Sequence, residues 1–226
     1  MIRRHGERGF SLLEMAIVLV IVGLLLGGML GGLGALQQRQ RAAQTEQQLA
    51  EIRDALIAFA VVNRRLPCPA APATPSTTAG AGLERVPTAG GCTGGVTGVL
   101  PWATLGLPET DAWGRRFSYR VSAAFARQAP AFTLASAGDN VVRNTAAVQI
   151  ALALPAVVVS HGVNTRGSRG PSGALAGASA DAREQENSDA DADFVADTPT
   201  ATFDDALVWV PAPLLFSRML QAGALP

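Results

Sequence analysis

The sequence predicts an α+β fold in which one long N-terminal α-helix packs on a C-terminal antiparallel β-sheet. Residues 15–63 contain no proline and change from an uncharged apolar run into an amphipathic segment, so we expect one continuous helix. Beyond residue 67, short β-branched runs alternate with glycine, proline and aspartate, as is typical of antiparallel sheets. Together these two patterns place the helix first and the sheet-forming domain after it.

The first element is a predicted transmembrane helix. Residues 15–36 carry no charge, and at about 1.5 Å per residue they form a helix of about 33 Å, long enough to cross a hydrocarbon core. A short basic leader precedes this run and contains Arg3, Arg4 and Arg8. Glu14 stands at the start of the run, where an unpaired acidic side chain costs on the order of a few kcal/mol. We therefore expect a functional role for Glu14.

Residues 9–14 read Gly-Phe-Ser-Leu-Leu-Glu. With the apolar run that follows, they resemble the cleavage and methylation motif of type IV prepilins and type II secretion pseudopilins. The resemblance implies that prepilin peptidase cuts between Gly9 and Phe10 and methylates the new amino group of Phe10. It also implies that Glu14 is an assembly residue, whose carboxylate pairs with the terminal amine of a neighbouring subunit. Such pairing would remove an unpaired charge from a medium of low dielectric.

A secretory signal peptide or an ordinary single-span anchor would account for fewer features of the N-terminus. A signal peptide carries its apolar region before the cleavage site, whereas here Gly9 precedes the apolar run. A single-span anchor accounts for the apolar run and the leader arginines, but it gives no reason for Gly9, Phe10 and Glu14 together.

The resemblance divides the chain into four parts. Residues 1–9 are the leader peptide, and residues 10–36 are the transmembrane helix and assembly segment. Residues 37–66 are an amphipathic stem helix, and residues 67–226 are a periplasmic globular domain with an antiparallel sheet and long loops. Apolar residues recur through the stem at three- and four-residue steps and predict one buried stripe: Leu49, Ile52, Leu56 and Phe59. A long helix packed on such a sheet is the pilin-like α/β roll.

The first part of the globular domain, residues 67–98, is a predicted loop that holds both cysteines, Cys68 and Cys92. In an exported domain we expect them to form one disulfide, which would close a loop of about 25 residues and stabilise the fold by about 3–4 kcal/mol. Neither cysteine belongs to a C-x-x-C motif, so the sequence does not favour a cysteine-bound zinc ion.

Apolar and β-branched runs beyond this loop predict strands and one terminal helix. The strands are expected at residues 117–121, 132–136, 148–152, 156–160 and 207–210. The terminal helix is expected near residues 214–221, and residues 138–140 are expected to form a turn.

An acidic segment between residues 164 and 203 is harder to assign. Alternating carboxylates near its end and a pair just after it are candidate calcium ligands: Asp189, Asp191, Asp193, Asp204 and Asp205. The EF-hand pattern is not met, because Phe194 and Thr200 stand where it requires glycine and glutamate. The resemblance adds that major pseudopilins bind calcium in a C-terminal loop. The alternative is a solvated and partly disordered acidic loop.

Composition and motifs argue against nucleic-acid binding and catalysis. The chain has 18 arginines, no lysine and 18 acidic residues, so its charge gives no strong attraction to nucleic acid. Ser160 and His161 supply two residue types of a hydrolase triad, but the chain has no G-x-S-x-G elbow. Adjacent residues of an extended segment also point to opposite faces. We therefore expect no enzyme, and no cofactor apart from the calcium alternative.

The expected function is that of a structural or assembly subunit. The resemblance implies a minor pilin or pseudopilin of a type IV pilus or a type II secretion-like filament. Its partners would be other pilin or pseudopilin subunits, prepilin peptidase and the inner-membrane assembly platform. It would span the bacterial inner membrane once, with its C-terminal domain in the periplasm, and reach a cell-surface filament after assembly. The alternative is a single-pass anchored periplasmic binding protein or enzyme.

Overall fold

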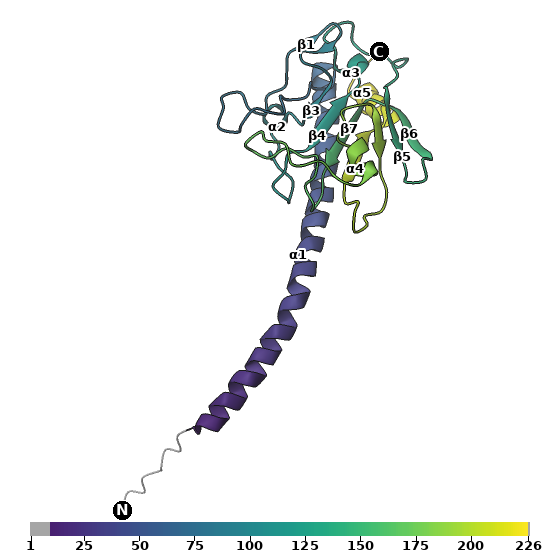
Figure 1. Ribbon diagram of the computed structural model, residues 1–226. Helices are drawn as coiled ribbons and strands as arrows, with labels where there is room; N and C mark the ends of the chain where they lie inside the picture. The colour runs from purple at the N-terminus through teal and green to yellow at the C-terminus, as the bar shows by residue number, and fades with distance from the viewer. Residues whose placement is uncertain (1–9, 226) are drawn as a thin grey trace, which may run out of the picture. The chain divides into compact units, whose positions relative to one another are not determined.

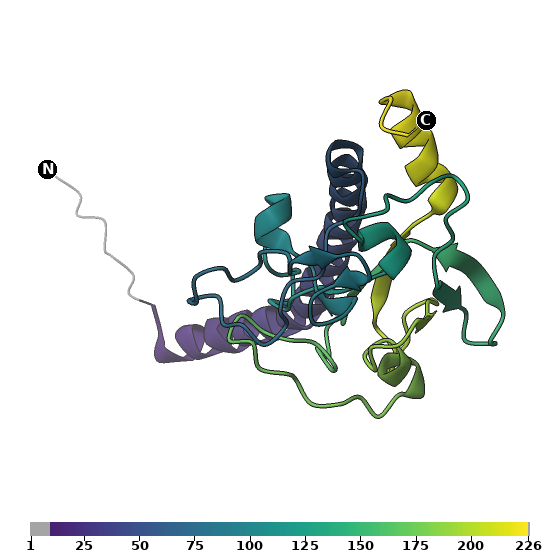
Figure 2. The same ribbon diagram turned by 90° about the horizontal axis from the view of Figure 1, so that it is seen from above.

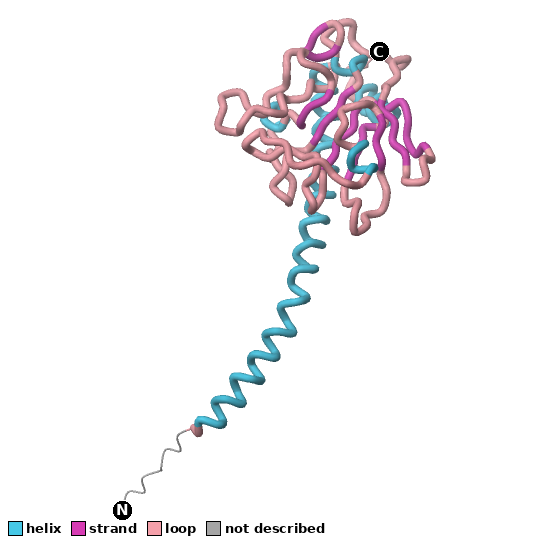
Figure 3. The backbone as a smooth tube through the Cα atoms, in the orientation of Figure 1, coloured by secondary structure: helices cyan, strands magenta, loops and turns pink. Residues whose placement is uncertain are grey.

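A computed structural model describes residues 10–225, with the backbone alone for residues 25–33. The N-terminal element is a single helix of 52 residues, α1 (Leu12–Asn63), which confirms the predicted continuous helix (Figure 1). Figure 3 shows that loops join the short helices and strands of the following domain. The strands are β1 (Pro87–Thr88), β2 (Gly91–Cys92), β3 (Thr97–Val99), β4 (Ser118–Val121), β5 (Asn140–Arg143), β6 (Gln149–Leu154), β7 (Ala156–Ser160), β8 (Asp193–Val195) and β9 (Ala206–Val210). The short helices are α2 (Trp102–Leu105), α3 (Ala123–Ala126), α4 (Ala182–Glu186) and α5 (Ala212–Gln221).

The chain divides into two compact units, Met1–Gln40 and Arg41–Pro226. In the first unit, the side chains that the structure describes from residue 10 onward are exposed. Among the described residues, no helix combines the length and the apolar character needed to cross a membrane. The second unit contains the rest of α1 and the whole globular domain.

The main sheet of the second unit has the strand order β3-β4-β7-β9 and is antiparallel throughout. Successive side chains of a strand point to opposite faces of the sheet. One of these two faces packs on the stem part of α1. Tyr119 of β4 and Val158 of β7 share one buried apolar core with Leu56 of α1. The helix α5 lies beside the C-terminal end of α1 and adds Leu215 to the same core (Figure 2).

A second sheet, with the order β6-β5-β8, lies over the opposite face of the main sheet. Val142 of β5 and Phe194 of β8 pack there against Val157 and Val159 of β7. The strands β5 and β8 run parallel, so the predicted antiparallel sheet describes the main sheet but not all of this domain.

Four predicted strands are confirmed as β4, β6, β7 and β9, and the predicted terminal helix is confirmed as α5. The strand predicted at residues 132–136 is wrong. Phe132 is buried against Phe125, with ring centroids 4.8 Å apart, but the Ser136 N–H closes a turn by donating to the Thr133 carbonyl. The acidic segment is not a loop throughout, because it contains α4 and β8.

Candidate assembly site and acidic clusters

A reciprocal cap between Ser11 and Glu14 closes the first turn of α1. The Glu14 N–H donates to Ser11 Oγ at 3.2 Å, and Glu14 Oε2 accepts from the Ser11 N–H at 3.0 Å and from Ser11 Oγ at 3.2 Å. This arrangement is a capping box, which satisfies backbone N–H groups that have no partner inside a helix. It fixes the Glu14 carboxylate at the start of the helix, next to the backbone of Ser11.

The predicted assembly residues are open in the single chain. The side chain of Phe10 is 79% exposed, and Glu14 is exposed as well. The positive end of the helix dipole favours an anion in the first turn, where Glu14 stands. A second chain could therefore approach this carboxylate from outside. The predicted cleavage residue Gly9 lies outside the described residues.

Comparison with known families bears directly on this site. Residues 4–30 match the family model of the prokaryotic N-terminal methylation motif. The chain carries the prepilin-type signature. This motif marks the type IV pilins and pseudopilins, and the matched range includes Gly9, Phe10 and Glu14. No curated protein and no solved structure matches the chain.

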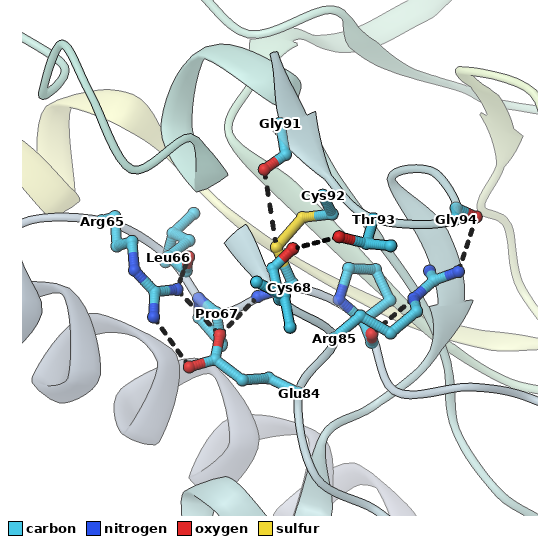
Figure 4. The surroundings of a disulfide bond; sticks show 12 residues. Arg65, Leu66, Pro67, Cys68, Glu84, Arg85, Gly91, Cys92, Thr93 and Gly94 are labelled. Carbon is cyan, nitrogen blue, oxygen red and sulfur yellow. Dashed lines mark hydrogen bonds and ion pairs between the residues drawn. A yellow bond between two sulfur atoms is a disulfide. The ribbon is translucent and has the colours of Figure 1, made fainter. Parts of the chain in front are cut away.

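In the globular domain, Cys68 and Cys92 form a disulfide, with their Cα atoms 5.7 Å apart (Figure 4). Glu84 holds the backbone next to this disulfide, since its Oε2 accepts a hydrogen bond from the Cys68 N–H at 3.0 Å. Both Glu84 oxygens also accept from Arg65, at 2.8 and 2.7 Å. The disulfide and this ion pair tie the cysteine loop to the chain just after α1.

Four of the five candidate calcium ligands fall into two groups, and Asp189 belongs to neither of these groups. Asp191 and Asp193 lie with Glu186, and one carboxylate oxygen of each is within 4.8 Å of the others. Asp189 and Asp191 each accept a hydrogen bond from the backbone N–H two residues later, at 3.1 and 2.8 Å. Asp193 pairs with Arg143. Most of these carboxylates are therefore engaged in local turns and an ion pair.

Asp204 and Asp205 belong to a second group with Glu184, and carboxylate oxygens of these three also lie within 4.8 Å of one another. Glu184 and Asp205 are buried. Glu184 Oε1 accepts from Asn164 Nδ2 at 2.7 Å and from the Asp204 N–H at 3.1 Å. Burial, together with the charges of Glu184 and Asp205, raises the pKa of Asp204 to about 6.

His161, which is fully buried, lies against this second group. Its Nε2 is 2.8 Å from Ser118 Oγ, and its Nδ1 is 3.6 Å from Asp205 Oδ1. In space, Ser118, His161 and Asp205 lie in the order of the serine, histidine and aspartate of a hydrolase triad. However, the 3.6 Å between His161 Nδ1 and Asp205 Oδ1 is too long for a hydrogen bond. Ser160, the serine considered from the sequence, instead donates to Asp111 Oδ2 at 2.6 Å.

Sequence reasoning did not identify the roles of Ser11, Glu184 and His161. The S-x-x-E spacing of residues 11–14 is a capping-box signal and was sufficient to find Ser11. No local pattern links the other two residues to Asp205. They come from α4 and from the end of β7, far from Asp205 along the chain.

Proposed function

We propose that this chain is a minor pilin or pseudopilin, a structural subunit of a type IV pilus or a type II secretion-like filament. The observation that carries the proposal is the match of residues 4–30 to the methylation motif, at the beginning of a helix of 52 residues.

Processing comes first in this proposal. Prepilin peptidase cuts between Gly9 and Phe10 and methylates the new amino group of Phe10. The cap supports this step, because it uses atoms of Ser11 and Glu14 alone and so survives removal of residues 1–9. The mature chain then begins one residue before a preformed helix end.

Membrane insertion precedes assembly. Residues 10–36 span the bacterial inner membrane once, and the stem of residues 37–66 carries the domain of residues 67–226 in the periplasm. The uncharged run of residues 15–36 and the leader arginines support this orientation. The disulfide between Cys68 and Cys92 suits an oxidising compartment.

Assembly depends on Glu14. Its carboxylate pairs with the Phe10 amine of a neighbouring subunit, which neutralises both charges where the dielectric is low. The exposure of Glu14 and Phe10 in the single chain supports this pairing, because a neighbour can reach both groups. The assembled filament then presents the domain at the cell surface or in the periplasm.

The globular domain supplies specificity rather than catalysis. Its partners are other pilin or pseudopilin subunits and the inner-membrane assembly platform, and no nucleic-acid partner is proposed, since the formal net charge is zero. The folded insertion that contains α4 and β8 adds bulk to the domain. Such bulk suits a low-copy subunit better than a closely packed filament shaft.

Replacing Gly9 tests the proposal. In cells that contain prepilin peptidase, Gly9→Val should leave the chain uncut, because a branched side chain then occupies the cleavage junction. Gly6→Val is the matched control, since Gly6 lies in the same leader but away from the junction. The control chain should be cut normally. Equal processing of both variants, or an uncut wild-type chain, would contradict prepilin processing at Gly9.

A further inference from the structure

Four ionisable side chains gather inside the globular domain, where three separate segments meet. His161 follows β7, Glu184 lies in α4, and Asp204 and Asp205 precede β9. The backbone at Gly162 allows this approach. It has a φ of +56°, and a Cβ there would lie 2.3 Å from the Asp204 carbonyl oxygen. The segments are thus brought closer together than a larger residue would permit.

Each of three residues in this group has one polar atom held by a hydrogen bond. His161 Nε2 is held by Ser118 Oγ at 2.8 Å. Asp205 Oδ2 accepts from Asn187 Nδ2 at 2.9 Å, and Asp204 Oδ2 accepts from the Asn164 N–H at 2.9 Å. These hydrogen bonds fix the orientation of the imidazole ring and of the two carboxylate groups.

The other polar atom of each of these residues is buried without a hydrogen-bond partner. The three atoms are His161 Nδ1, Asp204 Oδ1 and Asp205 Oδ1. Leaving a buried polar atom unpaired is unfavourable. Two of these atoms, His161 Nδ1 and Asp205 Oδ1, lie 3.6 Å apart, and Asp204 is the neighbour of Asp205, so the group calls for a ligand. Asp205 and His161 are the most telling, since both side chains are fully buried.

Charge leads to the same conclusion. Glu184, Asp204 and Asp205 bring three carboxylates together, and within the described part of the chain no arginine forms an ion pair with any of them. Among the described residues, the one basic side chain within 4.0 Å of any of these carboxylates is His161, which faces Asp205. Buried carboxylates are normally paired with a cation or bound to a metal.

The distance between His161 Nδ1 and Asp205 Oδ1 fits metal ligation. At 3.6 Å it exceeds a hydrogen bond. Two ligands bound to a tetrahedral zinc ion at about 2.1 Å lie about 3.4 Å apart. Ligands whose second polar atom is held by a neighbour are also typical of metal sites, because that contact orients the ligating atom.

We propose that His161 and Asp205 bind a divalent transition-metal ion of the zinc class, with the carboxylates of Asp204 and Glu184 beside Asp205. The imidazole nitrogen separates this site from an all-oxygen calcium site, since calcium takes oxygen ligands and zinc takes both nitrogen and oxygen. The bound ion joins the end of β7, α4 and the start of β9. This inference does not depend on the proposed filament function.

The test uses the full chain purified in detergent and stripped with a chelator. His5 is replaced by Gln in all samples, so that the other histidine of the chain cannot bind the ion. One equivalent of zinc should bind, and the melting temperature should rise by about 5–10 °C when free zinc is 100 times its Kd. X-ray absorption should show one nitrogen ligand and oxygen ligands at about 2.0–2.2 Å.

Two variants assign the binding to His161 and Asp205. Asp205→Asn should abolish the zinc-dependent rise in melting temperature while keeping the metal-free protein folded, because it removes charge without changing shape. His161→Gln should weaken zinc binding by about a hundredfold or more, because it removes a ligand, and loss of a residue that only orients a ligand already costs about tenfold to a hundredfold. Asp191→Asn is the control from the exposed acidic group and should leave zinc binding unchanged.

Three results would overturn the proposal. They are no rise in melting temperature with zinc, an undiminished rise in Asp205→Asn, and stabilisation by calcium alone that His161→Gln leaves unaffected. The last result would show an oxygen-only site without His161.

Discussion

Ser11 and Glu14 hold each other at the first turn of α1, since Glu14 Oε2 accepts two hydrogen bonds from Ser11 and the Glu14 N–H donates to Ser11 Oγ. The carboxylate that we propose for assembly is thereby fixed at the helix end before any neighbour arrives. A preformed geometry reduces the ordering that subunit addition would otherwise require.

Replacing Ser11 should loosen this end of the helix. Ser11→Ala removes the cap, which is worth about 1 kcal/mol, so amide exchange at residues 12–14 should become about fivefold faster in detergent micelles. Ser11→Thr keeps the hydroxyl and should exchange as the wild type does. Equal exchange in all three proteins would mean that the cap does not stabilise the first turn.

Replacing Glu14 should block assembly without blocking processing. Glu14→Gln keeps the side-chain shape but loses the charge that we propose pairs with the Phe10 amine, so incorporation into filaments should fall by about tenfold or more. Quantitative immunoblots of sheared filaments and membranes measure the ratio. Glu46→Gln, at an exposed position on the stem, is the control and should assemble normally. Normal incorporation of Glu14→Gln would rule out the pairing.

Removing the disulfide should destabilise the globular domain. The double variant Cys68→Ala and Cys92→Ala should lose about 3–4 kcal/mol of unfolding free energy, because the unfolded chain is no longer constrained. Denaturant titrations of the purified chain measure the loss. Added reductant should lower the stability of the wild type toward that of the variant and leave the variant unchanged. If reductant left the unfolding free energy of the wild type unchanged, this would contradict a stabilising disulfide between Cys68 and Cys92.

Arg116 should be among the most sensitive charged positions of the domain. Its side chain is fully buried, pairs with Glu109, donates to the Thr74 carbonyl at 2.8 Å and stacks on Trp102 at 4.6 Å. Arg116→Lys cannot reproduce this planar fork and should lose about 3–5 kcal/mol of unfolding free energy.

Arg53→Lys is the control for Arg116, because the pair of Arg53 with Asp54 is largely exposed. It should change the unfolding free energy by less than about 1 kcal/mol. Equal losses in the two variants, measured by the same titrations, would remove the special role of Arg116.

Local sequence patterns predicted the elements that depend on local features. Proline-free residues 15–63 gave one helix, and the β-branched run Ala156–Ser160 gave β7. The strand β8 was missed because it is short and carries one large apolar residue, Phe194, whose partners in β5 and β7 are distant along the chain. The apolar Phe132 led to a strand prediction that is wrong, because this residue packs on Phe125 just before a turn.

The two candidate sites differ in the same way. The methylation motif is contiguous, so Phe10 and Glu14 could be identified from their spacing alone. The buried group depends on tertiary contacts that bring His161 and Glu184 to Asp205, and no spacing encodes such contacts. The run Asp189, Asp191 and Asp193 has a ligand-like pattern, but the first two of its carboxylates cap their own turns.

The N-terminus of the mature protein tests most directly whether the chain is processed as a prepilin. Intact mass spectrometry and N-terminal sequencing should be applied to the protein isolated from membranes of cells that contain prepilin peptidase. We predict a chain that begins at Phe10 and carries one methyl group on its amino nitrogen. A chain that retains residues 1–9, or that begins within or after the apolar run, would contradict prepilin processing.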